Sequence, residues 1–441
     1  MVHWSVQRMV WSIALFALSH TGLCGQALGQ SSTRGLIDSV SRDNLGRHIK
    51  TLEAAGGHYS RINFTPGNDS GAAYIRRAFE ALPHLSSVQL DTFYISSAVP
   101  PLNSKPLVNV VGTLRGRRDP SRVFVVGAHF DCSASRMGAQ VWNEQWSTIR
   151  APGADDNATG VAAILELARV LSDTSSGFSN DYTTCFVAFG AEESGPAYAG
   201  SHHGSAHYAQ VVKSGLEDII GMVSIDMIGY NYRYYYQSIV SDPGSTWLGE
   251  VFVAANDSNS IGLTTSRTPF PYATYSDHAS FWDEGYPAVC LIENAPPWTS
   301  TAYYLANQYY HTSGDSLRTL NLELVRKVTQ MTLAAIVSLN TRVTSAPLGQ
   351  QGVPSTCELY QNYPNPFNPT TTIRFRAGHA EYVTLKVYDL LGRQITVLWD
   401  GNVSPGIYAF RWDATGFPTG VYFAKLTAGP FVASRKLMLL R

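Results

Sequence analysis

The stretch Arg122–Asp131 reads RVFVVGAHFD, in which an apolar run leads directly into a histidine and an aspartate. A continuous apolar run, rather than an alternation of apolar and polar residues, predicts a strand covered on both faces, as in a parallel sheet. Because successive side chains of a strand point to opposite faces, His129 and Asp131 fall on the same face. This stretch therefore predicts a buried strand that delivers two polar side chains at its carboxyl end.

The same pattern recurs along the chain, with helical segments between the strands. Three further apolar runs predict strands at Thr183–Ala191, Ile219–Ile225 and Ala288–Ile292. Helical periodicity covers Gly160–Leu171 and Leu322–Leu339. This order of elements predicts an α/β fold with a mostly parallel central sheet flanked by helices.

The composition is that of a large globular chain. Of its 441 residues, 44% are hydrophobic, 12% are aromatic and 15% are charged, which excludes a disordered chain of low hydrophobicity and high net charge. Lys and Arg total 32 and Asp and Glu total 33, so the net charge is −1 and gives no support for nucleic-acid binding. The length allows two or three domains.

The N-terminus has the features of an export signal. Arg8 precedes the apolar run Met9–Leu18, and the small residues Ala27 and Gly29 follow. A basic start, a short apolar stretch and small residues at the cleavage site are typical of a secretory signal peptide. Ten apolar residues cannot cross the ~30 Å hydrocarbon core of a bilayer. We therefore expect a signal peptide at residues 1–29, no stable membrane span, and a secreted or cell-surface protein.

A change in composition separates two further regions. Residues 346–356 (APLGQQGVPST) are rich in Gly, Pro and Gln, which indicates a linker. Beyond it, short alternating strands punctuated by glycine turns predict a small β-sandwich at 357–441. The expected division is therefore an α/β domain at 30–345, a linker at 346–356 and a C-terminal β-sandwich.

Acidic residues and histidines from distant segments fall at one edge of the predicted sheet. They are His129, Asp131, Asp155, Asp156, Glu192, Glu193, Asp226 and His311. In open α/β sheets, ligands bind beyond the carboxyl ends of the strands. So many carboxylates would repel one another unless cations neutralised them, and a mixture of histidine and carboxylate ligands suits Zn²⁺.

The number of candidate ligands favours two cations. One catalytic zinc needs fewer protein ligands if it keeps an open position, whereas two ions about 3.5–4 Å apart can share a carboxylate and a water. Glu192 and Glu193 are adjacent, so in strand geometry their side chains diverge, and one can bind metal while the other faces the water. Asp131 can accept a hydrogen bond from the second ring nitrogen of His129.

Six short motifs together closely resemble family 28 of the metallopeptidases, which includes secreted bacterial two-zinc aminopeptidases. The motifs are HFD (129–131), PGADDNATG (152–160), GAEES (190–194), SIDMIGY (224–230), SDHASF (276–281) and YHTSGDS (310–316). The resemblance runs from about Asn44 to Leu339. It implies a zinc exopeptidase-like fold, with residues 30–345 as the catalytic domain and two Zn²⁺ ions per chain.

The resemblance also implies a role for each site residue. The implied zinc ligands are His129 and Asp226 on one ion, Glu193 and His311 on the other, and Asp156 between them. Asp156 is chosen over Asp155 because the family's bridging residue lies four positions before the glycine that matches Gly160. Glu192 would be the general base that deprotonates the bridging water, and Asp131 would orient His129. Tyr310 resembles a tyrosine that stabilises the oxyanion in some members.

The expected activity is hydrolysis of the N-terminal peptide bond of peptides. Two alternatives are a glutaminyl cyclase-like acyltransferase on the same fold and a metal-stabilised surface binding module without turnover; a carboxypeptidase also remains possible within the family. Other polar or aromatic clusters are interpreted as structural: a surface helix with His202, His203 and His207, pocket or supporting residues Asp277 and His278, and a loop or pocket wall at Tyr230–Tyr236.

The C-terminal region carries motifs of its own. They are YPNPFNP (363–369), VYDLLGRQI (387–395), GVYFAKL (420–426) and the terminal KLMLLR (436–441). Together they resemble the type IX secretion sorting domain of diderm bacteria, which implies the type IX machinery as a partner and passage through the outer membrane. The alternative interpretation is an ordinary carbohydrate-binding or spacer β-sandwich.

Overall fold

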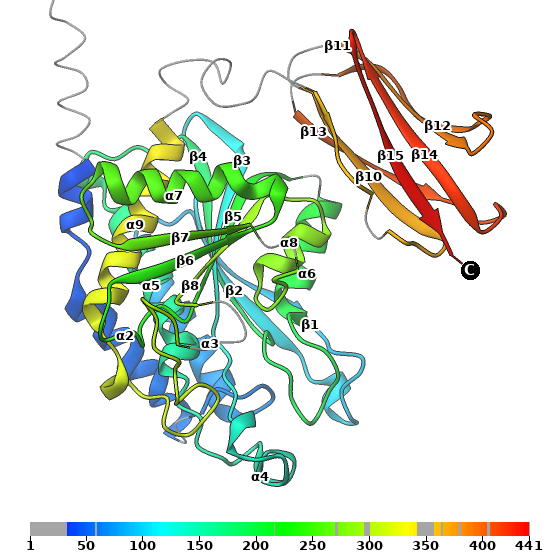
Figure 1. The fold of residues 1–441 in the computed structure, drawn as a ribbon. Coiled ribbons are helices and arrows are strands. Elements are labelled where there is room, and N and C mark those ends of the chain that lie inside the picture. The colour runs from blue at the N-terminus through cyan, green and yellow to red at the C-terminus, as the bar shows by residue number, and fades with distance from the viewer. Residues whose placement is uncertain are drawn as a thin grey trace, which may run out of the picture. The chain divides into compact units, whose positions relative to one another are not determined.

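The computed structural model describes residues 33–57, 60–215, 217–269, 272–294, 300–341, 357–362, 365–377, 381–403 and 406–440. The chain divides into two compact units, Met1–Thr341 and Arg342–Arg441 (Figure 1). The expected signal peptide at 1–29 and the expected linker at 346–356 lie outside the described residues. Within the described part of the chain, every helix is too short or too polar to cross a bilayer.

The first unit is built from eight strands and from helices on both sides of them. The strands are β1 (Ser87–Phe93), β2 (Leu107–Leu114), β3 (Asp119–His129), β4 (Tyr182–Phe189), β5 (Asp218–Asp226), β6 (Tyr236–Ser241), β7 (Thr264–Pro269) and β8 (Ala288–Ile292). The helices are α2 (Arg42–Glu53), α3 (Pro66–Glu80), α4 (Ala139–Gln145), α5 (Thr159–Ser172), α6 (His203–Ser214), α7 (Thr246–Ser258), α8 (His278–Asp283) and α9 (Leu322–Thr341).

The strands form one sheet in the order β1-β2-β4-β3-β5-β8-β6-β7. The four central strands, β4, β3, β5 and β8, are mutually parallel. On one side of this centre β2 joins β4 antiparallel, and on the other β6 joins β8 antiparallel. The predicted α/β fold is confirmed, and its parallel centre brings the carboxyl ends of four strands to the same edge.

Side chains of the central strands pack against a different helix layer on each face. In β3, Phe124, Val126 and Ala128 belong to the cluster that contains α2, α5, α7 and α9, whereas Val123 and Val125 pack with α6 and α8. Figure 1 shows these two groups of helices on opposite sides of the sheet. Burial on both faces explains why these strands are continuous apolar runs rather than alternating ones.

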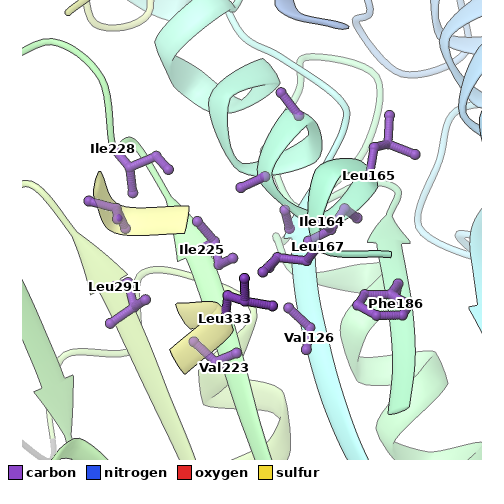
Figure 2. Packing of buried hydrophobic residues seen from close by; sticks show 14 of the residues in the cluster. Val126, Ile164, Leu165, Leu167, Phe186, Val223, Ile225, Ile228, Leu291 and Leu333 are labelled. Carbon is purple, nitrogen blue, oxygen red and sulfur yellow. The ribbon is translucent and has the colours of Figure 1, made fainter. Parts of the chain in front are cut away.

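The larger core fixes α5 against the middle of the sheet. Figure 2 shows Ile164 and Leu167 of α5 among side chains of the central strands, with Leu333 of α9 beside them. Burying one such side chain contributes about 1.5–3 kcal/mol. This packing holds the N-terminal end of α5, and with it the PGADDNATG segment, beside the carboxyl ends of the strands.

One strand boundary differs from the prediction. The strand expected at Thr183–Ala191 ends at Phe189, and Ala191 adopts a left-handed conformation with φ of 54°. The backbone of Gly190 lies so close to Val108 that a Cβ at Gly190 would be 2.6 Å from that carbonyl oxygen. Glu192 and Glu193 therefore lie in a turn beyond the strand rather than within it.

The second unit consists of two antiparallel sheets. One contains β9 (Glu358–Leu359), β10 (Thr370–Ala377) and β13 (Gly406–Asp413), and the other contains β11 (Glu381–Asp389), β12 (Gln394–Val403), β14 (Gly420–Ala428) and β15 (Phe431–Leu439). Inward side chains of both sheets, among them Phe375, Trp412, Leu385 and Leu426, share one core. This is the β-sandwich that the alternating pattern predicted.

Candidate metal centre

Beyond the carboxyl ends of the central strands lies a small cavity of about 20 Å³, enough for one or two water-sized groups. Its polar side is formed by His129, Asp156, Glu192, Glu193, Asp226 and His311. Its remaining wall is formed by Met227, Tyr275, Ile292 and Tyr310. All six polar residues were candidates from the sequence, and the structure brings them to one place.

The first half of the cavity is built from strand ends. His129 is the last residue of β3 and Asp226 the last of β5, and these two strands are paired. Nε2 of His129 lies 3.4 Å from Oδ1 of Asp226, 3.2 Å from Oδ1 of Asp156 and 3.9 Å from Oε2 of Glu192. His129, Glu192 and Asp226 thus each offer a ligand atom, and these atoms lie within 4.8 Å of one another.

The second half is built from loops. Nε2 of His311 lies 2.8 Å from Oε1 of Glu193 and 2.9 Å from Oδ2 of Asp156. The ligand atoms of these three residues also lie within 4.8 Å of one another. Because Asp156 faces His129 with one oxygen and His311 with the other, its carboxylate connects the two halves.

Backbone contacts hold Asp156 in this position. The backbone N–H groups of Asp155 and Asp156 donate to the two oxygens of Asp315, at 2.9 and 3.0 Å. The guanidinium of the fully buried Arg61 donates to the carbonyls of Pro152 and Gly153, which precede the pair. Asp155 points elsewhere and accepts from the backbone of Gly229. Only Asp156 of the two faces the cavity.

Asp131 braces the neighbouring glutamates as well as facing His129. Its oxygens accept hydrogen bonds from the backbone N–H groups of Glu192 and Glu193, at 3.1 and 3.0 Å, and from the side chain of Asn63. Nδ1 of His129 lies 3.5 Å from Asp131, outside the range of a short hydrogen bond. Asp131 therefore ties the glutamate turn to the strand end that carries His129.

The second histidine is held through its other ring nitrogen. Nδ1 of His311 lies 2.9 Å from the hydroxyl of Ser135, which leaves Nε2 facing the cavity. The ring of Tyr310 stacks on the His311 ring with centroids 3.8 Å apart, and the guanidinium of Arg136 lies 4.7 Å above the Tyr310 ring. Burial and the nearby Asp156 and Glu193 carboxylates raise the pKa of Tyr310, so its hydroxyl keeps its proton.

The electrostatics of the cavity fit a site for cations. Burial raises the pKa of Glu193 to about 8, although His311 opposes the shift. Burial lowers the pKa of His311, but Glu193 and Asp156 outweigh this and raise it to about 10. Burial opposes ionisation of Asp156, yet its hydrogen bonds to His129 and His311 hold its pKa well below the usual range. A bound cation would neutralise the negative charge of the Asp156 and Glu193 carboxylates.

Two buried oxygens supply a direct test of that fit. Oδ1 of Asp226 has no hydrogen-bond partner among the residues that the structure describes. Among the same residues, Oε1 of Glu193 also has none, although Nε2 of His311 lies 2.8 Å away. Buried, unsatisfied carboxylate oxygens that converge on histidine nitrogens are suited to zinc coordination. The residues present therefore fit metal ions.

One residue at the site was not expected from the sequence. His202 was assigned to a surface helix, but its Nε2 lies 3.0 Å from Oε1 of Glu192, and its side chain is 17% exposed. The local sequence gave no indication of this contact, because a backbone turn before α6 brings His202 back to Glu192. His203 and His207 do lie on α6 outside the cavity lining, with His207 paired to Asp91.

The two other clusters singled out from the sequence divide between interior and surface. Asp277 and His278 are fully buried, and Asp277 exerts its charge on His129, Glu192 and His202. In the segment Tyr230–Tyr236, Tyr230 is buried, while Tyr232, Tyr234 and Tyr235 are exposed. The tyrosine segment is absent from the lining of the cavity.

Comparison with known proteins assigns the first unit to a protein family. A model of the family described as "Peptidase family M28" matches residues 109–336, just over half of the chain. This chain belongs to peptidase family M28. As a member of that family it is a metal-dependent hydrolase, and the donor set described above agrees with zinc.

The similar proteins agree with this family. A "probable zinc metalloprotease" of Phaeosphaeria nodorum is 24% identical over 365 residues, which cover 71% of this chain and 70% of the relative. The zinc aminopeptidase BSAP of Bacillus subtilis has a TM-score of 0.53 at 17% identity, covering 70% of this chain and 97% of that one. An Acidobacteriales glutaminyl cyclase has a TM-score of 0.54 at 19% identity, covering 69% and 96%. The M28 fold of the first unit is thus shared with both kinds of enzyme.

The second unit is identified separately. A model described as "Secretion system C-terminal sorting domain" matches residues 361–440, nearly all of the β-sandwich. The sorting domain points to a protein that is secreted or carried to the cell surface. It also agrees with the resemblance seen in the C-terminal motifs.

Proposed function

We propose that this M28 chain is a secreted zinc aminopeptidase that removes the N-terminal residue of peptides with the help of two zinc ions. The observation that carries the proposal is the pair of ligand clusters joined by the Asp156 carboxylate. In this proposal His129 and Asp226 would hold one ion, Glu193 and His311 would hold the other, and Asp156, which faces both histidines, would serve both. Bound zinc supplies water of lowered pKa and polarises the carbonyl of the scissile bond.

The remaining residues act on the proton and on the developing charge. Glu192 accepts a proton from the attacking water and passes it to the leaving amine; Oε2 faces the cavity while Oε1 contacts His202. Tyr310, which lines the cavity and keeps its proton, donates to the oxyanion of the tetrahedral intermediate. Asp131 holds the backbone of both glutamates and lies beside His129.

The shape and charge of the cavity favour an exopeptidase acting on a free amine. The cavity is small, is lined by five carboxylate or histidine ligands, and ends against the apolar wall of Met227 and Ile292. The free α-amino group of the substrate would be held beside the metal ions and the carboxylates that bind them. Among the proteins of similar fold, BSAP of Bacillus subtilis is a zinc aminopeptidase. We therefore assign cleavage to the first residue of the substrate.

The domain order proposed for export is a signal peptide at 1–29, a catalytic domain at 30–345, a linker at 346–356 and a sorting domain at 357–441. The match of residues 361–440 to a secretion sorting domain supports the last of these. We propose the type IX machinery as the partner of this domain.

The test compares aminoacyl amides, their N-acetylated forms and glutaminyl peptides as substrates of the zinc-loaded chain. We expect hydrolysis of the free-amine amides alone, loss of activity with a chelator, and recovery with zinc. Glu192→Gln should abolish most hydrolysis while it retains zinc, and Glu144→Gln on exposed α4 is the matched control. Cyclisation of glutaminyl peptides without amide hydrolysis would instead establish the acyltransferase alternative.

A further inference from the structure

The proposed general base is contacted on both of its oxygens, from opposite sides. Oε1 of Glu192 lies 3.0 Å from Nε2 of His202, and Oε2 lies 3.9 Å from Nε2 of His129. Both Glu192 and His202 are largely shielded, with side-chain exposures of 9% and 17%. The contact with His202 therefore directs one oxygen away from the metal centre and leaves the other facing it.

The backbone of His202 also contacts Glu192. Its N–H donates to the carbonyl of Glu192 at 2.9 Å, so residues 192 and 202 are joined through both backbone and side chain. His202 adopts φ of 58° and ψ of 26°, a left-handed conformation that is uncommon for residues other than glycine. This conformation carries strain, and strained residues tend to cluster at functional sites.

A third buried group, Asp277, interacts electrostatically with the imidazole of His202. Asp277 is fully buried, and its charge acts on both His202 and Glu192. Burial lowers the pKa of His202, but its hydrogen bond to Glu192 and the charges of Glu192 and Asp277 raise it to about 9. The two carboxylates thus favour an imidazole that donates from Nε2 toward Glu192.

Without the contact to His202, the carboxylate of Glu192 is free to bind a metal ion. Its ligand atom lies within 4.8 Å of those of His129 and Asp226, close enough for the three to share one ion. A glutamate bound directly to zinc is a poor acceptor for the proton of the attacking water, because its lone pairs are engaged by the metal. What Glu192 does therefore depends on what holds its carboxylate.

We propose that His202 is a positioning residue that donates a hydrogen bond to Glu192 and keeps it in the role of general base rather than zinc ligand. This inference rests on the proposed function, since Glu192 has that role only in the hydrolytic reaction. The contact joins His202, at the start of α6, to Glu192, in the turn after β4.

The first test separates positioning from a purely structural role by using variants of different reach. His202→Asn tolerates the left-handed backbone but is too short to reach Glu192, so kcat should fall about 10- to 100-fold with KM nearly unchanged. His202→Gln can place an amide nitrogen where Nε2 lies and should recover much of that loss. The melting temperature of His202→Asn should equal or exceed that of the wild type. His207→Gln, on the same helix but paired to Asp91, is the matched control.

The second test needs no turnover and uses zinc affinity measured by chelator competition. We expect His202→Asn to bind zinc several-fold more tightly, because the released Glu192 can join His129 and Asp226. The double variant Glu192→Gln/His202→Asn should match Glu192→Gln alone. If the wild type hydrolyses none of the amides, the aminopeptidase proposal fails. The zinc affinities of the single and double variants would still show whether the effects of changing residues 192 and 202 depend on each other.

Three results would overturn the inference. The first is wild-type kcat in His202→Asn. The second is a parallel loss of activity and melting temperature that His202→Gln does not relieve, which would indicate a structural role. The third is strict additivity of the two substitutions in zinc affinity.

Discussion

The two halves of the metal centre are held by different kinds of structure. His129 and Asp226 are 1% and 4% exposed, and each is paired in the sheet, His129 with Phe189 of β4 and Asp226 with Ile292 of β8. Glu193 and His311 lie in loops, and His311 adopts a left-handed φ of 56° with its side chain 14% exposed. A strand-end ligand takes its position from the sheet, whereas a loop ligand needs contacts of its own.

Those contacts can be identified on the loop side. Ser135 contacts Nδ1 of His311, the backbone N–H of Arg136 donates to the His311 carbonyl at 3.0 Å, and Asp131 fixes the backbone of Glu193. Loop segments open locally at lower free-energy cost than central strands. We therefore expect the strand half to bind its zinc more tightly and the loop half to lose its zinc first.

The largest expected effect comes from the residue that joins the halves. Asp156→Asn removes the carboxylate that faces both His129 and His311, and hydrolysis should fall about 10³-fold or more, because metal ions supply several kcal/mol of transition-state stabilisation. Bound zinc, measured by atomic absorption after dialysis, should fall below that of the wild type. Asp155→Asn is the control and should keep its zinc, since Asp155 faces Gly229. If Asp155→Asn lost zinc while Asp156→Asn kept all of it, Asp155 rather than Asp156 would be the residue that joins the two halves.

A smaller effect is expected from Asp131, which lies beside His129 of the strand half and holds the backbone of Glu193 of the loop half. Asp131→Asn keeps the shape of the side chain but removes a charge that accepts three hydrogen bonds, so zinc affinity should fall about 10- to 100-fold. The unfolding free energy should also fall by about 1–3 kcal/mol, because buried N–H donors lose their acceptor. Chelator competition and denaturant titration measure the two quantities. An Asp131→Asn protein with unchanged affinity for both ions would show that this brace is dispensable.

The corresponding change on the loop side should be milder. Ser135→Ala removes one hydrogen bond to His311, which costs about 0.5–1.5 kcal/mol, or up to about tenfold in affinity. The loss should appear in the more weakly bound zinc ion alone, as resolved by stepwise chelation. Equal weakening of both ions would contradict the independence of the two halves.

The smallest effect concerns the metal-free protein and pH. Carboxylate neighbours raise the pKa of His311 from 6.5 to about 10 despite burial, so the folded chain holds a proton that the unfolded chain releases. Stability from this group is therefore complete below pH 6.5 and is lost as the pH rises through about 10. The melting temperature of the chelator-treated protein should fall by a few degrees across that window. Zinc-loaded protein should not show the fall, since zinc binding requires a deprotonated imidazole.

The sequence predicted the strand half more directly than the loop half. The apolar runs before His129 and Asp226 indicated buried parallel strands, and the period of such strands placed these side chains at one sheet edge. His311 has no such strand before it, so the residues alone made it a candidate without a position in the sheet, and its role as a ligand came from the resemblance to a peptidase family. The observed proximity of His311 to Glu193 and Asp156 depends on a left-handed backbone and on Ser135.

Other features could not be predicted because they depend on long-range packing. The pattern for β4 continued to Ala191, but the strand ends at Phe189 and Ala191 adopts a left-handed conformation. His202 looked like part of a surface helix, and its contact with Glu192 arises from the turn that precedes α6. The antiparallel strands β2 and β6 were also missed, since they join the sheet through partners distant in sequence.

The most direct test of the account is anomalous diffraction at the zinc edge from crystals of the zinc-loaded chain. We predict two peaks about 3.5–4 Å apart, one beside His129 and Asp226 and one beside Glu193 and His311, with Asp156 between them. A single peak, or two peaks in separate pockets, would contradict a two-zinc centre shared by the strand and loop halves.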